Sequence, residues 1–341
     1  MSDLHQVRAA IARAGEYSGG ATVLFPAGDY FLGSADDTYK LLSGNRLQNV
    51  RFLGERATLS CRSVAGVSNM LVLEGCRNVS IEGLTFRDDG LKREINWLGA
   101  AAIRLANDGA TGCENVQISD CTFDSVLGAL VCREGNPGVR SRGVRLSNVT
   151  INRSYYGLNF QHDGDGVTAR ELRCRDVKRS YFPYGISDHD IELEAIANET
   201  GFTDVLISCY RRNTANIRVK LTSRGKRGGD ALVNLDHQNE VPNLAFRNIA
   251  LELDVDDVDC RLDTAILFRA MDRDKKIESR TTRRWEAISL DGDVRICEKT
   301  KLIELTSVSE RPSTLRIGPR LARHPRLPSS FPGFDVEIAR S

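Results

Sequence analysis

The sequence has 341 residues, with 47 Lys and Arg against 46 Asp and Glu, so its net charge is close to zero. The basic excess of a nucleic-acid-binding protein is missing, and the apolar runs are far shorter than the roughly 20 residues of a membrane span. We therefore expect neither a nucleic-acid partner nor a membrane span. Residues 1–8 show no basic stretch leading into an apolar core, which predicts a cytoplasmic protein, although a trimmed secreted chain would look the same.

The nine cysteines are scattered along the sequence, and their number is odd with no C-x-x-C pair. Several, such as Cys121 and Cys174, fall at strand positions whose neighbours are expected to point inward. This distribution predicts buried, reduced thiols rather than a disulfide framework.

The first predicted element is a helix within residues 1–18. Leu4, Val7, Ile11 and Ala14 recur at helical spacing, which places them on one apolar face. Residues 19–32 follow as a strand, a Pro-Ala-Gly turn and a second strand. A solenoid exposes an apolar end, and this helix is suited to cover one.

Short apolar runs recur through the central part of the chain. Three of them, residues 101–107, 128–134 and 156–162, are each followed by a second run of one pattern, at 115–123, 143–151 and 166–174. Units of strand size that repeat at a regular interval indicate a solenoid. Apolar residues alternate with polar ones in the second runs, which predicts one buried and one solvated strand face.

Small polar residues recur where the chain should turn a corner, as at Gly83, Asp120 and Asn148. We predict three parts: a capping helix at 1–18, a β-helix at 19–308 and an irregular tail rich in Pro and Arg at 309–341. Less regular rungs are expected at 204–208, 216–221, 231–237, 243–249, 264–269, 286–290 and 302–305, with a charged loop at 273–284.

A family resemblance supports this fold. The stretch Gly19-Gly-Ala-Thr-Val-Leu-Phe-Pro-Ala-Gly-Asp-Tyr30, after a short amphipathic helix, resembles the cap and first rung of the pectate-lyase and polygalacturonase superfamily, or pectin-lyase-like proteins. Segments 49–54, 78–86 and 115–123 resemble its later rungs, and the likeness covers most of residues 2–300. It implies an all-β chain folded as a single-stranded right-handed parallel β-helix with an N-terminal capping helix. The superfamily includes lyases, hydrolases, epimerases, esterases and inert tailspikes, so the fold leaves the chemistry open.

Polar residues gather at and after the ends of the predicted first strands. Rungs stack about 4.8 Å apart, so these ends should form one column. Three of the five histidines, His162, His189 and His237, fall in it. Imidazoles beside carboxylates suit general acid–base chemistry on a sugar, and arginines suit binding of a carboxylate-bearing substrate. The alternative is that polar residues merely solvate the loop end of the coil.

One segment of the column carries a second resemblance. Tyr184-Gly-Ile-Ser-Asp-His-Asp190 is similar to the Tyr-Gly-Phe-Asp-Pro-His-Asp/Glu motif of mannuronan C5-epimerases. Tyr184, His189 and Asp190 match the motif. Ser187 stands where the family has its aspartate and Asp188 where it has proline, which puts epimerase activity in doubt unless Asp188 takes that role.

These residues predict roles for β-elimination or epimerisation of a uronate-containing polysaccharide or oligosaccharide. The base would be His162 or His189, the acid Tyr184, and the carboxylate would be neutralised by an arginine. The candidate catalytic residues are His162, His189, Tyr184, Asp163, Asp165, Asp188, Asp236 and His237. The candidate substrate-binding residues are Arg104, Arg133, Glu134, Gln161, Tyr156, Asp190 and Arg269.

Two further hypotheses stay open. Asp163 and Asp165 are spaced as a carboxylate pair for glycoside hydrolysis, although the ordered polygalacturonase motifs are not found. A non-catalytic β-helix that binds a glycan, like a tailspike, would need no acid–base pair. No metal site or cofactor is predicted beyond the suggestion that Asp163, Asp165, Asp188 and Asp190 could supply oxygen ligands to Ca²⁺. The sequence does not predict the oligomeric state.

Overall fold

The computed structural model describes residues 3–35, 40–63, 69–90, 100–133, 136, 138–197, 203–210, 212–225, 228–238, 244–257, 261–271, 284–306 and 313–339. The chain divides into two compact units, Met1–Val177 and Lys178–Ser341. Each unit contains two parallel sheets, which we call A1 and B1 in the first unit and A2 and B2 in the second.

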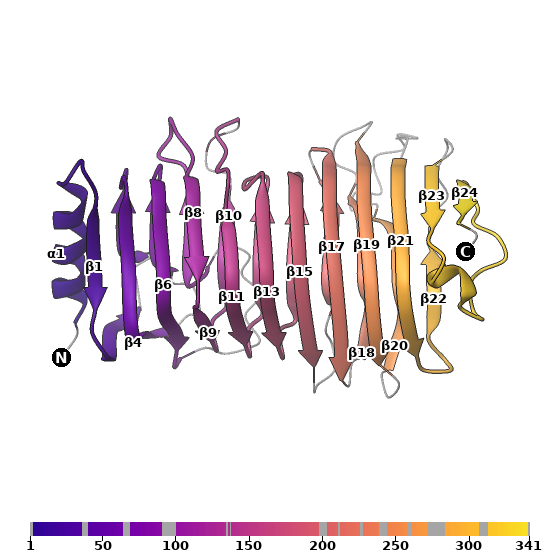
Figure 1. Ribbon diagram of the computed structural model, residues 1–341, viewed down its shortest axis with the longest axis horizontal. Coiled ribbons are helices and arrows are strands. Elements are labelled where there is room, and N and C mark those ends of the chain that lie inside the picture. Colours follow the sequence, from indigo (N-terminus) through magenta and orange to yellow (C-terminus); the bar gives the residue numbers. More distant parts are fainter. Residues whose placement is uncertain are drawn as a thin grey trace. The chain divides into compact units, whose positions relative to one another are not determined.

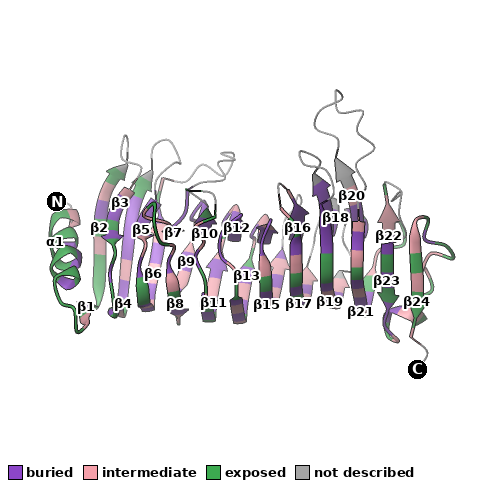
Figure 2. Cartoon of the chain, turned by 90° about the horizontal axis from the view of Figure 1, so that it is seen from above, coloured by how far each residue is buried: buried purple, intermediate pink, exposed green. Residues whose placement is uncertain are grey.

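The first unit opens with helix α1 (Leu4–Gly15), which buries Val7, Ile11 and Ala14. The helix lies beside β1, with an exposed outer side (Figures 1 and 2). It therefore covers one end of this unit, as its apolar spacing predicts. Sheet A1 consists of β1 (Ala21–Phe25), β2 (Gly28–Ala35), β4 (Val50–Ser63), β6 (Arg77–Asp88), β8 (Glu114–Ser119), β9 (Thr122–Asp124), β11 (Arg145–Asn152) and β13 (Val167–Arg175). Sheet B1 consists of β3 (Lys40–Asn45), β5 (Asn69–Glu74), β7 (Ile103–Ala106), β10 (Gly128–Arg133) and β12 (Tyr156–Gln161).

The second unit repeats the arrangement. Sheet A2 consists of β15 (Ser187–Ala197), β17 (Thr214–Gly225), β19 (Ala245–Asp257), β21 (Arg284–Ile296), β23 (Ser313–Ile317) and β24 (Phe334–Ile338). Sheet B2 consists of β14 (Arg179–Tyr184), β16 (Thr203–Cys209), β18 (Gly228–Gln238), β20 (Arg261–Met271) and β22 (Lys301–Leu305). A short 3₁₀ helix, η1 (Leu321–Arg323), lies between β23 and β24. Part of the predicted irregular tail is thus regular, because β23 and β24 extend A2.

The A and B strands bury their residues differently. In A1 and A2 buried residues alternate with exposed ones, as in β17, so one face of each sheet forms the core. Strands β10, β12 and β16 are buried on both faces over most of their length (Figure 2). Successive strands of each sheet belong to successive rungs, and the pairing within each unit is parallel, as between β17 and β19. The predicted coil is therefore present in each unit.

The corners are built by residues in the left-handed backbone conformation. Asn49, Asn78 and Asn115 have φ between 54° and 55° and stand at one corner of successive A1 rungs. Asn78 Nδ2 donates to Asn49 Oδ1 at 2.9 Å, and Asn115 Nδ2 donates to Asn78 Oδ1 at 3.2 Å. We call this an asparagine ladder. Asparagine tolerates this conformation better than most residues, which explains why small polar residues recur there.

All eight cysteines that the structure describes carry free thiols, and seven of them are buried. Burial raises the pKa of Cys121 and of Cys209 to about 12. These thiols pack as small apolar groups. Among the described residues, no helix has the length and apolar character to cross a membrane.

Candidate functional site: the outer faces of the short-strand sheets

The outer face of B1 carries a group of polar side chains that we call the arginine cluster: Arg104, Arg133, Asn159 and Gln161. Arg104, Val131 and Asn159 lie opposite one another on β7, β10 and β12, and Arg133 lies opposite Gln161. Side chains two residues apart on a strand share a face. The four polar groups therefore surround Val131 on adjacent strands.

The exposure of the two arginines makes this cluster chemically distinctive. Arg133 is exposed and Arg104 is half-buried. Burial, followed by the like charge of Arg133, lowers the pKa of Arg104 to about 10. Arg104 and Arg133 are diagonal neighbours on adjacent strands, so their two positive charges together favour a bound anion. The planar N–H groups of a guanidinium suit a carboxylate.

The outer face of B2 carries a second polar row. Tyr184, Ser208, Asp236 and Arg269 lie opposite one another on β14, β16, β18 and β20. We call these residues the tyrosine–arginine row, which spans about 14 Å at the usual strand spacing. Ser208 and Asp236 are buried, whereas the Arg269 side chain is 27% exposed and Tyr184 is also partly exposed. Asp236 Oδ1 lies 3.5 Å from Arg269 Nε, so a buried carboxylate holds a partly exposed guanidinium.

Aromatic rings surround the tyrosine end of this row. The ring centroids of Phe182 and Tyr184 are 5.3 Å apart, and Tyr210 meets Tyr184 edge-on at 6.1 Å. The guanidinium carbon of Arg179 lies 5.3 Å from the centre of the Phe182 ring. Faces of such rings are the usual platform for the apolar face of a sugar.

The candidate catalytic residues Asp163 and Asp165 hold a turn of the first unit. The Asp163 carboxylate is fully buried and accepts hydrogen bonds from the Ser141 hydroxyl at 3.1 Å and the Gly164 N–H at 2.8 Å. Burial raises the pKa of Asp163. Asp165 forms an ion pair with Arg140. Both carboxylates are thus engaged in the turn rather than placed as a pair across an open groove.

Two of the predicted histidines lie in the core of the second unit, which corrects the expected column. His189 is 2% exposed, and its Nδ1 is 2.8 Å from the Tyr181 hydroxyl. His237 is 1% exposed, its Nε2 is 2.9 Å from the Leu244 carbonyl oxygen, and its ring packs against Trp285. Neither imidazole faces a groove that could hold a sugar.

The error at residues 188–190 has a simple geometric cause. Strand β14 ends at Tyr184, and Gly185, with φ of 62°, turns the corner into β15. Asp188, His189 and Asp190 therefore belong to sheet A2, whereas Tyr184 belongs to B2. Asp188, Asn216 and Asn248 are left-handed corner residues of A2 that form an asparagine ladder of the second unit, in which Asp188 accepts a hydrogen bond from Asn216 Nδ2 at 2.8 Å.

The remaining predicted residues have different placements. His162 follows β12 in the left-handed conformation and is 9% exposed, and its carbonyl oxygen accepts a hydrogen bond from Arg140 Nε at 3.1 Å. Tyr156, predicted to bind substrate, is fully buried in the core of the first unit. Asp190 lies on A2 opposite Arg218. Glu134 lies outside the described residues.

Sequence analysis missed Ser208, Asn159 and Tyr210. The sequence does contain a signal for Ser208 and Asn159. Each is a polar residue within a short apolar run, and each lies two residues before another polar position, Tyr210 and Gln161, which indicates an outward-facing side chain. Tyr210 follows β16 and carries no such signal. For a metal, no group of three His, Cys, Asp or Glu side chains comes together anywhere in the described ranges. The oxygen ligands suggested for Ca²⁺ are divided between the turn of the first unit and sheet A2 of the second.

Comparison with known proteins identifies the fold. Neither a protein-family model nor a curated protein matches the sequence. A similar solved structure is the Azotobacter vinelandii mannuronan C-5 epimerase AlgE6 A-module, with a TM-score of 0.53, 12% identity and coverage of 100% of this chain and 96% of that chain. Another is the Streptococcus pneumoniae surface protein and adhesin PfbA, with a TM-score of 0.50, 13% identity and coverage of 89% and 96%.

Both are right-handed parallel β-helix proteins. The chain thus has the all-β solenoid fold with an N-terminal helix that the sequence predicts. An adhesin and an epimerase share this fold, so it leaves the function open.

Proposed function

We propose that the protein binds an acidic polysaccharide on the outer face of sheet B1. The observation that supports this most strongly is the arginine cluster, where Arg104 and Arg133 lie as diagonal neighbours on β7 and β10. Bringing two like charges together on a half-buried surface costs free energy, which a bound carboxylate would recover. The exposed Arg133 gives the ligand access.

The tyrosine–arginine row supports the carbohydrate part of this proposal. Tyr184 offers a partly exposed ring that packs against the buried Phe182, and Arg269 offers a guanidinium that Asp236 holds in place. This combination of a stacking platform and oriented donors is what sugar recognition requires.

Turnover by β-elimination or epimerisation is the second candidate function. Tyr184, the expected proton donor, supports this candidate because it is partly exposed at one end of the row whose other end is Arg269. His189, a predicted base, lies in the core, so the geometry supports binding better than turnover. A hydrolase built on Asp163 and Asp165 is supported less, because both carboxylates hold the turn.

The test is binding of a panel of polymers: mannuronan, polygalacturonate and a neutral glucan, measured by calorimetry at low salt. The double variant Arg104→Gln/Arg133→Gln should bind the acidic polymers about tenfold more weakly or worse, since one hydrogen bond to a charged group contributes about 1.5–3 kcal/mol. Arg145→Gln/Arg175→Gln is the matched control, because both residues are exposed on A1 and this variant also removes two positive charges.

Equal binding of the neutral glucan, or an equal loss in Arg145→Gln/Arg175→Gln, would refute the proposal. Incubation with the acidic polymers separates binding from turnover. Elimination yields an unsaturated uronate that absorbs in the ultraviolet, epimerisation changes the uronate composition of the polymer, and binding alone leaves the polymer unchanged.

A further inference from the structure

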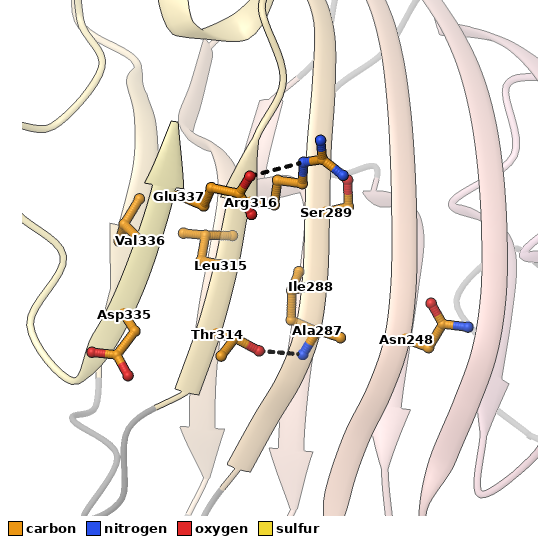
Figure 3. A pocket seen from close by; sticks show the side chains of 10 residues that line it. All are labelled: Asn248, Ala287, Ile288, Ser289, Thr314, Leu315, Arg316, Asp335, Val336 and Glu337. Carbon is orange, nitrogen blue, oxygen red and sulfur yellow. Dashed lines mark hydrogen bonds and ion pairs between the residues drawn. The ribbon is translucent and has the colours of Figure 1, made fainter. Parts of the chain in front are cut away.

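A hollow of about 520 Å³ lies on the outer face of sheet A2, over β19, β21, β23 and β24 (Figure 3). Small side chains form its floor, because β21 contributes Ala287 and Ser289 there. Longer side chains stand around them, namely Asn248 on β19, Arg316 on β23 and Glu337 on β24. Its volume lies within the usual range of small-molecule sites.

The hollow exists because the asparagine ladder of the second unit ends there. Asn216 Nδ2 donates to Asp188, and Asn248 Nδ2 donates to Asn216 Oδ1 at 3.1 Å. The next corner residue is Ala287, which has the same left-handed conformation with φ of 55° but carries only a methyl group. Asn248 Oδ1 therefore receives no amide donor from the next rung, and the space of one side chain stays open.

The walls of the hollow are rich in acceptors. Asp335 and Glu337 are both exposed on β24, opposite Thr314 and Arg316. Arg316 Nε lies 3.9 Å from Glu337 Oε1, so the one guanidinium that lines the hollow is already near a carboxylate. Figure 3 shows the Arg316–Glu337 ion pair, and the bond from the Ala287 N–H to the Thr314 hydroxyl at 2.6 Å.

An adjoining hollow of about 190 Å³ continues this surface through the shared residue Ser289. Two guanidinium groups line it. Arg320 is held by Glu252 at 2.9 Å and by Asp291 at 3.2 Å, and Arg218 is exposed on β17. The larger hollow itself has two carboxylates, Asp335 and Glu337, against the single guanidinium of Arg316. A ligand here must bring donors and, preferably, positive charge.

We propose that this surface, the ladder-end hollow, binds an amino-sugar residue. The ammonium group would lie against Asp335 and Glu337 on β24. Asn248 lies three strands away on β19, about 14 Å at the usual strand spacing, so hydroxyls of the next sugar residue would donate to its Oδ1. A uronate would meet two like charges, so this site is distinct in chemistry from the arginine cluster and does not depend on it.

The probe is the disaccharide of glucosamine, compared with its N-acetylated form, by calorimetry or by changes in the ligand NMR spectrum. The unmodified chain should bind the amino form, and Asp335→Asn/Glu337→Gln should weaken this binding about fivefold. Asp29→Asn/Glu298→Gln is the matched control, since both residues are exposed, neither lines the hollow, and this variant also removes two negative charges.

A second variant protects the test against misfolding. Ala287→Asn keeps a residue that accepts this backbone conformation, adds an amide that can donate to Asn248 Oδ1, and fills the floor of the hollow. We expect a raised unfolding temperature and weaker disaccharide binding. The proposal is overturned if the N-acetylated disaccharide binds equally well, if Asp29→Asn/Glu298→Gln loses as much affinity, or if Ala287→Asn folds and binds unchanged. Binding of polyuronates should be unaffected by these variants, which separates this test from that of the arginine cluster.

Discussion

Replacing His189 tests whether this residue serves the core or a catalytic site. His189→Ala removes a side chain that is 2% exposed and breaks the 2.8 Å hydrogen bond to the Tyr181 hydroxyl. Truncating a large buried side chain costs about 2–5 kcal/mol, and a buried polar group that loses its partner costs about 1–3 kcal/mol. Because these contributions overlap, we expect a loss of about 3–5 kcal/mol in the free energy of unfolding.

Two companion variants make this prediction sharper. Tyr181→Phe keeps the ring and removes only the hydroxyl, so it should cost about 1–2 kcal/mol. His5→Ala changes a histidine that is exposed on α1, and should change stability by less than about 0.5 kcal/mol. Urea unfolding followed by circular dichroism measures all three.

A core role also predicts that His189→Ala, where it remains folded, binds acidic polymers as the unmodified chain does. The opposite pattern would refute this placement: unchanged stability together with lost binding or turnover would put His189 at the site.

Three other properties of the fold lead to predictions. Asn78→Ala should lower the free energy of unfolding by about 2 kcal/mol, because it removes two ladder hydrogen bonds and places alanine at φ of 54°. Asn78→Gly removes the same bonds without the backbone cost, so thermal unfolding should show a smaller loss, and an equal loss would contradict the backbone part of this argument. Burial raises the pKa of Cys121 and of Cys209 to about 12. Both thiols should therefore stay unlabelled by an alkylating reagent at neutral pH until the chain unfolds. Peptide mass spectrometry measures this, and labelling of the native chain would contradict their burial. Asp163 has a pKa raised by burial above its ordinary 3.8, so its contribution to stability is full below pH 3.8 and is lost as the pH rises through the raised value. The unmodified chain should therefore gain stability relative to Asp163→Asn as the pH falls through this window, and a constant difference would contradict it.

Much of the fold could be predicted from the sequence because the repeat itself carries the information. Alternation in the A strands separates buried from solvated positions, and corners such as Asp120 and Asn148 do adopt the left-handed conformation, with φ of 54° and 50°. Strands β23 and β24 were not predicted, since they are short and lie in a segment rich in proline and arginine. Local composition there suggests irregular structure, and only pairing with the preceding rung makes these residues strands.

The candidate site was predictable only in part, because B strands are buried on both faces. Along such a strand the sequence does not distinguish the core side from the outer side, so Asp236 and His237 looked equivalent although they point in opposite directions. Tyr184 and Asp236 lie in one row because of their register, which depends on where each corner falls. The prediction placed the corner after His189, whereas the chain turns at Gly185. This difference was enough to assign His189 to sheet B2 instead of A2.

The central claim is that an acidic polysaccharide lies on the outer face of sheet B1. The most direct measurement is photo-crosslinking with a uronate oligomer that carries a photoreactive group, followed by mass spectrometry of the labelled peptides. We predict labels on the peptides that contain Arg104 and Arg133, and competition by unlabelled polyuronate. Labels confined to the outer faces of A1 or A2, with the peptides of the arginine cluster unlabelled, would contradict the account.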